Sequence, residues 1–134
     1  NSTDVMEDVQ VPNTPALYDD PAMRNLLHYF LHDMKEHTGV GLSPTYSYLR
    51  VYKNGDVLHK HTDREDCEYS VSLTLKREPS DEIWPLYLQT DKTYAVSLEE
   101  GDGLIYKGIE NPHWRESFKG ERLAQVFLHY VRRH

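Results

Sequence analysis

The chain has 134 residues, which is the size of one domain rather than two. Fifteen Lys and Arg against 22 Asp and Glu give a net charge of −7, and this disfavours nucleic acid and anionic membranes because both require a positive field. No apolar run approaches the roughly 20 residues that cross a bilayer, and a single Cys excludes an internal disulfide. We therefore expect one cytoplasmic domain over residues 1–134 with no membrane contact.

The first part of the chain predicts an extended arm followed by one helix. Residues 1–20 are polar, contain two prolines and have no apolar periodicity. Asp20 can cap a helix and Pro21 is tolerated at its first position, while Gly39 can supply a left-handed stop. The predicted helix covers residues 21–38, and its apolar stripe recurs at three- and four-residue spacing in Met23, Leu26, Leu27, Phe30 and Met34.

The remainder of the chain is typical of short strands. Tyr-rich and β-branched stretches alternate with turn residues, and Asn54-Gly55 predicts a two-residue hairpin. Eight strands after one helix favour a mainly β fold, for which a jelly roll over residues 43–132 is a natural solution. The predicted strands cover residues 45–53, 57–63, 69–76, 83–89, 93–98, 104–107, 113–118 and 122–132.

A His-x-Asp pair is the first sign of chemistry. His61 and Asp63 lie on one predicted strand, so their side chains point the same way and can share a metal ion. His113, at the start of a later strand, is the candidate third ligand. Two His and one carboxylate with open positions suit non-haem Fe(II) oxygen chemistry. The alternative interpretation of H-x-D is a pair of polar residues at a strand end.

Two further residues lie at informative offsets from these ligands. Arg122 follows His113 by nine residues and begins the last predicted strand, and its guanidinium can bind a carboxylate with two hydrogen bonds. Tyr52 precedes His61 by nine residues, on the strand before the Asn54-Gly55 turn. The face that continues from Arg122 is small and apolar, and we expect it to line the interior.

Three elements follow one another along the chain: Y-x-x-G…H-x-D, then G-D-x-L-I-Y…H, then an Arg nine residues on. In this order they resemble the 2-oxoglutarate/Fe(II)-dependent dioxygenases, and within them the prolyl 4-hydroxylase-like branch. The resemblance covers about residues 43–131 and implies a double-stranded β-helix supported by the N-terminal helix. It also implies Fe(II), 2-oxoglutarate and O2 as reactants, with ascorbate as reductant. The implied metal ligands are His61, Asp63 and His113, and the implied contacts of the distal 2-oxoglutarate carboxylate are Arg122 and Tyr52.

The resemblance predicts hydroxylation of prolyl residues in a peptide or protein. A free amino acid or another small molecule is the alternative substrate, and a non-redox, cupin-like metal-binding module is the alternative from a different class. Relatives that demethylate nucleic acids place a second Arg six residues after the first, where this chain has Leu128. Together with the charge, this predicts no nucleic-acid substrate.

Candidate substrate contacts follow from strand alternation. Tyr48 and Arg50 share the predicted face of Tyr52, and His59 shares that of His61. Cross-strand packing, or exposure at the rim, is the alternative for each of these residues. Arg64 and Arg115 stand beside predicted ligands and could hold a substrate carbonyl, although solvated or salt-bridged side chains are the simpler interpretation. Cys67 is interpreted as an ordinary buried thiol.

Overall fold

The computed structural model describes residues 4–8 and 11–133, with side chains from residue 16 onward. Its helices are α1 (Pro21–Tyr29), α2 (Leu31–Thr38) and the 3-10 turn η1 (Glu65–Cys67). Its strands are β1 (Asp4–Asp8), β2 (Val11–Tyr18), β3 (Leu42–Lys53), β4 (Leu58–His61), β5 (Tyr69–Glu78), β6 (Leu86–Gln89), β7 (Thr93–Val96), β8 (Gly103–Tyr106), β9 (His113–Arg115) and β10 (Arg122–Arg132).

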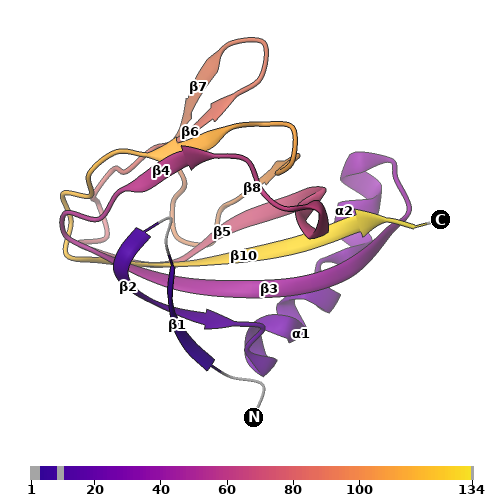
Figure 1. Cartoon of the computed structure of the whole chain (residues 1–134), viewed down its shortest axis with the longest axis horizontal. Coiled ribbons are helices and arrows are strands. Elements are labelled where there is room, and N and C mark those ends of the chain that lie inside the picture. The colour runs from indigo at the N-terminus through magenta and orange to yellow at the C-terminus, as the bar shows by residue number, and fades with distance from the viewer. Residues whose placement is uncertain (1–3, 9–10, 134) are drawn as a thin grey trace.

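Two antiparallel sheets face each other, and the two helices pack on the outer side of the larger one (Figure 1). The larger sheet has the order β1-β2-β3-β10-β5-β8, and the smaller has the order β4-β9-β6-β7. The mainly β prediction is confirmed. The eight strands predicted between residues 45 and 132 correspond to β3 through β10, with ends that differ by a few residues.

The predicted N-terminal arm is hydrogen-bonded into the larger sheet where the structure describes it. β1 pairs with β2, and β2 pairs with β3 in the register Ala16↔Arg50. Residues 1–3, 9 and 10 of that predicted arm lie outside the described residues.

The single helix predicted over residues 21–38 is wrong, because the chain forms two short helices there. The predicted ends are correct: the Asp20 carboxylate accepts hydrogen bonds from the amides of Ala22 and Met23, and Gly39 ends α2 at a φ of 72°. The break falls at Phe30, where ψ is −1°. The change of direction lets Leu27 of α1 and Met34 of α2 both pack against the same curved sheet. Neither helix has the length and apolar composition that a membrane crossing requires, and this holds for every helix among the described residues.

The Asn54-Gly55 turn does not close a hairpin, and that prediction was wrong. Gly55 has the positive φ of 89° that such a turn needs. However, β3 pairs with β10 and β2, whereas β4 pairs with β9 in the other sheet. The turn therefore carries the chain from one sheet to the facing sheet.

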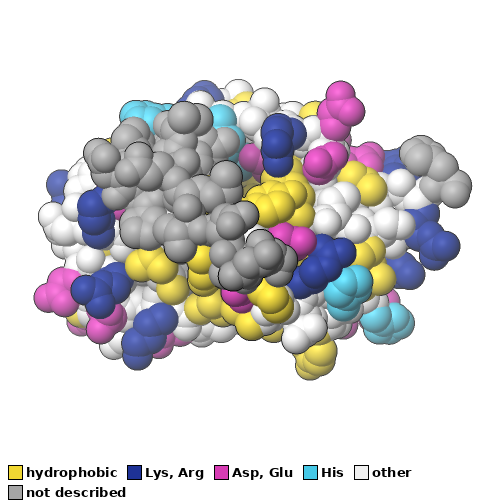
Figure 2. Space-filling view, turned by 60° about the horizontal axis from the view of Figure 1, so that its bottom comes forward, with side chains coloured by type: hydrophobic (Ala, Val, Ile, Leu, Met, Phe, Trp, Pro, Cys, Tyr) yellow, Lys and Arg dark blue, Asp and Glu magenta, His cyan; other side chains and the backbone are white. Residues whose placement is uncertain are grey.

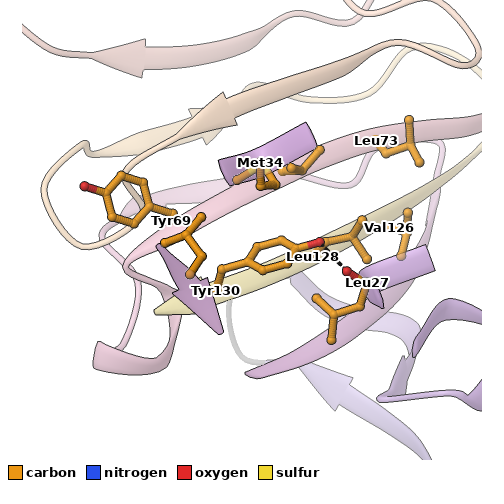
Figure 3. Close-up of a cluster of buried hydrophobic side chains, with 9 residues drawn as sticks. Leu27, Met34, Tyr69, Leu73, Val126, Leu128 and Tyr130 are labelled. Atoms are coloured by element: carbon orange, nitrogen blue, oxygen red, sulfur yellow. Dashed lines mark hydrogen bonds between the residues drawn. The ribbon is translucent and has the colours of Figure 1, made fainter. Parts of the chain in front are cut away.

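Side chains of β10 alternate between two different cores. Val126, Leu128 and Tyr130 face the helices, and the Tyr130 hydroxyl donates to the Leu27 carbonyl at 2.6 Å (Figure 3). Leu123, by contrast, packs with Tyr52 and residues of the smaller sheet between the two sheets. The odd-numbered residues of β10 thus face the interior of the sandwich, and the even-numbered residues face outward.

Candidate functional site

The structure brings His61, Asp63 and His113 together between the sheets. β4 and β9 pair with His61 opposite His113, so both imidazoles stand side by side. Asp63 Oδ1 lies 3.2 Å from His61 Nε2 and 3.3 Å from His113 Nε2. One ligand atom from each of the three residues lies within 4.8 Å of the others, which is close enough for one metal ion.

Both imidazoles are oriented by the backbone. Nδ1 of His61 lies 2.7 Å from the carbonyl oxygen of His59, and Nδ1 of His113 lies 2.8 Å from that of Asn111. A carbonyl oxygen only accepts, so each Nδ1 carries a proton, and each Nε2 is directed at Asp63. Metal-binding histidines are held in this way in most proteins, because the second hydrogen bond sets the tautomer and the ring plane.

Asp63 is placed by a loop contact rather than by strand alternation. β4 ends at His61, so the predicted strand geometry does not extend to Asp63. Instead, the Asp63 amide donates to the Gly108 carbonyl at 2.8 Å. A Cβ at position 108 would overlap Asp63 Oδ2 and the Cys67 carbonyl oxygen. The absence of a side chain at Gly108 is therefore what allows the carboxylate to reach the two imidazoles.

The donor set fits a divalent metal. Burial by itself raises the pKa of Asp63, but hydrogen bonds from His113 and His61 hold the pKa of this carboxyl well below its usual value. The second oxygen, Oδ2, is buried and has no hydrogen-bond partner among the described residues. A carboxylate with an unused buried oxygen, beside two imidazole nitrogens, is the arrangement that Fe(II) binds in two-His-one-carboxylate sites.

A second group of donors adjoins the first. Asp63, Cys67 and His129 also lie close enough to hold one ion. Burial lowers the pKa of His129 to about 4 and raises the pKa of the Cys67 thiol to about 11, so both are neutral near pH 7. Nδ1 of His129 lies 2.7 Å from the Ser70 hydroxyl. His129 was not predicted as a site residue, because the even-numbered face of β10 was expected to line the interior, and its odd-numbered position identifies it only once the structure shows which face lies inside.

Arg122 does not lie in the site, contrary to the expectation. Its side chain is 70% exposed and its guanidinium is 3.9 Å from the Glu78 carboxylate on the neighbouring strand. The strand alternation was correct, but the face was assigned wrongly: the even-numbered positions of β10 face the helices and solvent. Leu123, which follows Arg122, is the residue that points into the sandwich.

Tyr52 does lie in the interior, and it is part of a buried polar group. It is fully buried, and its hydroxyl accepts a hydrogen bond from Arg50 Nη1 at 3.0 Å. Arg50 also stacks over the rings of Tyr48 and Phe127. Arg115, two residues after His113, is 2% exposed and its Cζ lies 5.9 Å from the centre of the Tyr52 ring. Arg115 was expected to be salt-bridged or solvated, but it is buried and forms no ion pair with the residues that the structure describes.

The other predicted substrate contacts are nearer the surface. Tyr48 is half-buried, whereas His59 and Arg64 are exposed. Arg64 donates to the Tyr46 hydroxyl at 3.2 Å, and the Tyr46 ring stacks on Tyr18 with centroids 5.0 Å apart. Tyr46 also contacts His129, with ring centroids 4.7 Å apart. An aromatic wall therefore runs from the surface to the second donor group.

No family model and no curated protein matches the sequence, whereas solved structures match nearly all of it. A prolyl-4-hydroxylase from Pseudomonas putida is 18% identical with a TM-score of 0.71, over 98% of this chain and 79% of that one. The non-haem α-ketoglutarate-dependent epimerase SnoN from nogalamycin biosynthesis is 11% identical with a TM-score of 0.73, over 97% and 66%. HygX from Streptomyces hygroscopicus, solved with nickel, 2-oxoglutarate and hygromycin B, is 14% identical with a TM-score of 0.71, over 97% and 74%.

The chain has the fold of the 2-oxoglutarate/Fe(II)-dependent oxygenases. At these identities the likeness establishes the fold alone. Metal binding and a reaction are indicated by this chain's own residues, namely the clustered donors and the buried polar interior.

Proposed function

We propose that this protein is an Fe(II)- and 2-oxoglutarate-dependent hydroxylase in which His61, Asp63 and His113 hold the metal. The observation that carries the proposal is the convergence of two Nε2 atoms and the ionised Asp63 carboxylate on one point. Both Nδ1 atoms are already committed to carbonyl oxygens, and Asp63 Oδ2 is buried without a partner among the described residues. A divalent cation at this point would use both Nε2 atoms and the free carboxylate oxygen.

The bound iron, with 2-oxoglutarate and O2, supplies the chemistry: one oxygen atom enters a substrate C–H bond while 2-oxoglutarate becomes succinate and CO2. The chain contributes positioning and charge. Asp63 provides the one negative charge that offsets the divalent ion. His61, Asp63 and His113 would hold the ion, and three protein ligands would leave it able to bind 2-oxoglutarate and O2. The Tyr106 ring lies 4.8 Å from that of His113, and both are buried, so bulk water is kept from this side.

We propose a prolyl residue of a peptide or protein as the substrate. The aromatic wall of Tyr46 and Tyr18, with Arg64 over the Tyr46 ring at 5.5 Å, supports this. Aromatic side chains at the surface are how many proteins bind proline-rich segments. One of the neighbours in fold is itself a prolyl-4-hydroxylase. The other candidate is a small molecule, and the neighbour that was solved with hygromycin B supports that alternative.

Mass spectrometry distinguishes these substrates. The protein is incubated with Fe(II), 2-oxoglutarate, ascorbate and either proline-containing peptides or free amino acids, under air. We expect a peptide product that is heavier by one oxygen atom and succinate in equal amount, and neither with Asp63→Ala. Hydroxylation confined to free amino acids would refute the prolyl-peptide proposal while leaving the chemistry intact.

The non-redox, cupin-like alternative makes a different prediction. A metal-binding module without oxidative chemistry gives no charge-transfer absorption when 2-oxoglutarate is added to the Fe(II)-loaded protein without oxygen. We expect a visible absorption band in this experiment. The absence of that band, together with tight Fe(II) binding, would favour the cupin-like alternative.

A further inference from the structure

Arg115 is a buried cation that forms no ion pair with any described residue. Nη1 donates to the Trp84 carbonyl at 2.8 Å, but Nε and Nη2 are buried and have no hydrogen-bond partner among the described residues. No carboxylate in the described part of the chain forms an ion pair with it. Leaving a buried charge uncompensated is strongly destabilising, and two free N–H groups add to this cost.

The surroundings of Arg115 stabilise a cation only partly. Its Cζ lies 4.6 Å from the centre of the Trp84 ring and 5.9 Å from that of Tyr52, so the ring faces offer weak electrostatic support. Arg50, whose Nη1 donates to the Tyr52 hydroxyl, adds a second positive charge nearby. An anion between these groups would offset both charges.

The position of Arg115 relative to the metal ligands suits a short dianion. His113 and Arg115 are two residues apart on β9 and face the same way, which separates their Cα atoms by roughly 6.6 Å. An extended five-carbon dicarboxylate, with four C–C bonds of about 1.5 Å, has its carboxyl carbons about 5 Å apart. Such a molecule can therefore reach from the donors at His113 to the guanidinium of Arg115.

We propose that Arg115 binds the distal carboxylate of 2-oxoglutarate through Nε and Nη2, with a further hydrogen bond donated by the Tyr52 hydroxyl. The inference rests on the proposed function and assigns to Arg115 the role that the resemblance implies for Arg122. A guanidinium edge with two free N–H groups matches the two oxygens of a carboxylate. The Tyr52 oxygen already accepts from Arg50, which leaves its own hydrogen for another acceptor.

Arg122 provides a matched control on the same protein. It is the arginine at the predicted nine-residue spacing from His113, but its side chain is 70% exposed and points away from the sandwich. Replacing it removes a surface ion pair with Glu78 and nothing from the interior. If Arg122, nine residues after His113, bound the distal carboxylate, replacing Arg122 rather than Arg115 would weaken 2-oxoglutarate binding.

Calorimetry on the Fe(II)-loaded protein without oxygen tests the assignment. Each variant is titrated with 2-oxoglutarate and with 2-oxopentanoate, which keeps the keto acid and replaces the distal carboxylate by a methyl group. We expect Arg115→Met to weaken 2-oxoglutarate binding on the order of a hundred-fold or more, because one side of a buried charge pair is lost. Binding of 2-oxopentanoate should hardly change. Arg115→Lys should recover only part of the loss, since a point charge replaces a planar fork.

Arg122→Met should stay within about two-fold of the wild type for both ligands, because an exposed ion pair contributes little. Thermal unfolding gives an independent readout: without ligand, Arg115→Met should melt at least as high as the wild type, but 2-oxoglutarate should no longer raise its Tm. Unchanged 2-oxoglutarate affinity in Arg115→Met, or a large loss in Arg122→Met, would overturn the assignment.

Two results separate this inference from the proposed function. If the wild-type protein binds Fe(II) but not 2-oxoglutarate, the proposed function fails and the assignment fails with it. If the wild type binds 2-oxoglutarate and the variants behave alike, only the role of Arg115 fails. Should Arg115→Met not fold, the comparison of Arg115→Lys with Arg122→Met decides, because the exposed position of Arg122 tolerates substitution.

Discussion

Asp63 combines a charge, a buried position and a backbone constraint in one side chain. We expect Asp63→Ala to lose most of the Fe(II) affinity and all turnover, because it removes the one anionic donor from the cluster with His61 and His113. Metal titration of the apoprotein measures the affinity. His59→Ala is the control, since His59 is exposed and contributes only its backbone carbonyl to the orientation of His61. Affinity that survives in Asp63→Ala would show that the metal binds elsewhere.

Gly108 tests whether the placement of Asp63 matters apart from its charge. Gly108→Ala introduces a methyl group into the space of Asp63 Oδ2 and the Cys67 carbonyl oxygen, so the carboxylate must move. We expect metal affinity to fall by on the order of ten-fold or more, because a metal site tolerates little displacement of its ligands. Gly41→Ala is the control, since a Cβ there meets no other atom. Equal metal affinity in the two variants would mean that the loop at Gly108 adapts freely.

At the scale of elements, β10 connects the two cores of the molecule. Its even-numbered side chains pack against the helices, while Leu123, Gln125 and His129 face the interior with the site. This parity explains why Arg122 is outside, whereas Arg115 on β9 is inside because it shares the face of His113. It also means that the helix-side core can be weakened without touching the ligands.

Leu128→Ala tests this separation. Leu128 is fully buried in the helix-side core, so we expect the free energy of unfolding to fall by about 2–5 kcal/mol. Urea denaturation measures it, and Fe(II) affinity at low temperature should remain close to that of the wild type. Leu75→Ala, at a side chain that is 37% exposed, should cost less than about 1 kcal/mol. A large loss of metal affinity in folded Leu128→Ala would contradict the separation of the two cores.

At the scale of the whole molecule, stability depends on pH through buried groups such as His129. Burial lowers the pKa of His129 to about 4, below the value of about 6.5 expected in the unfolded chain. Between these values the unfolded state binds more protons, so the stability of the folded protein falls as the pH falls. This contribution reaches about 3 kcal/mol when both pKa values have been crossed.

Urea unfolding of the apoprotein at several pH values between 7 and 4 measures this dependence. The variant His129→Gln keeps a polar side chain that does not titrate, and its stability should fall less steeply over the same range. Parallel curves for the two proteins would show that His129 is not the group responsible.

The surface charge leads to a prediction about partners. On the face in Figure 2, Lys and Arg side chains are interspersed with Asp and Glu, and the described residues there form no continuous basic patch. With a net charge of −7, we expect no binding to single- or double-stranded DNA or RNA in a mobility-shift assay at physiological salt. A shift that weakens with added salt would contradict this prediction.

The sequence by itself determined those features that depend on local spacing. Alternation and turn residues located the strands between residues 45 and 132, capping residues located both ends of the helical segment, and H-x-D with a later His identified the three side chains that converge. These predictions succeed because each depends on chemistry within a few residues or on a motif that preserves its order along the chain.

Only the tertiary structure decided which face of each strand lies inside. The alternation that places Arg122 and Leu128 on one face does not say which face lies inside. In the structure the helices cover the face of Leu128, so this face is not the one between the two sheets. The contact between Gly108 and Asp63, the neutral His129 and the unpaired Arg115 all arise between segments that are far apart in sequence. Burial is a property of the assembled sheets. The tertiary structure is therefore needed to show that Arg115 is buried without an anionic partner among the described residues.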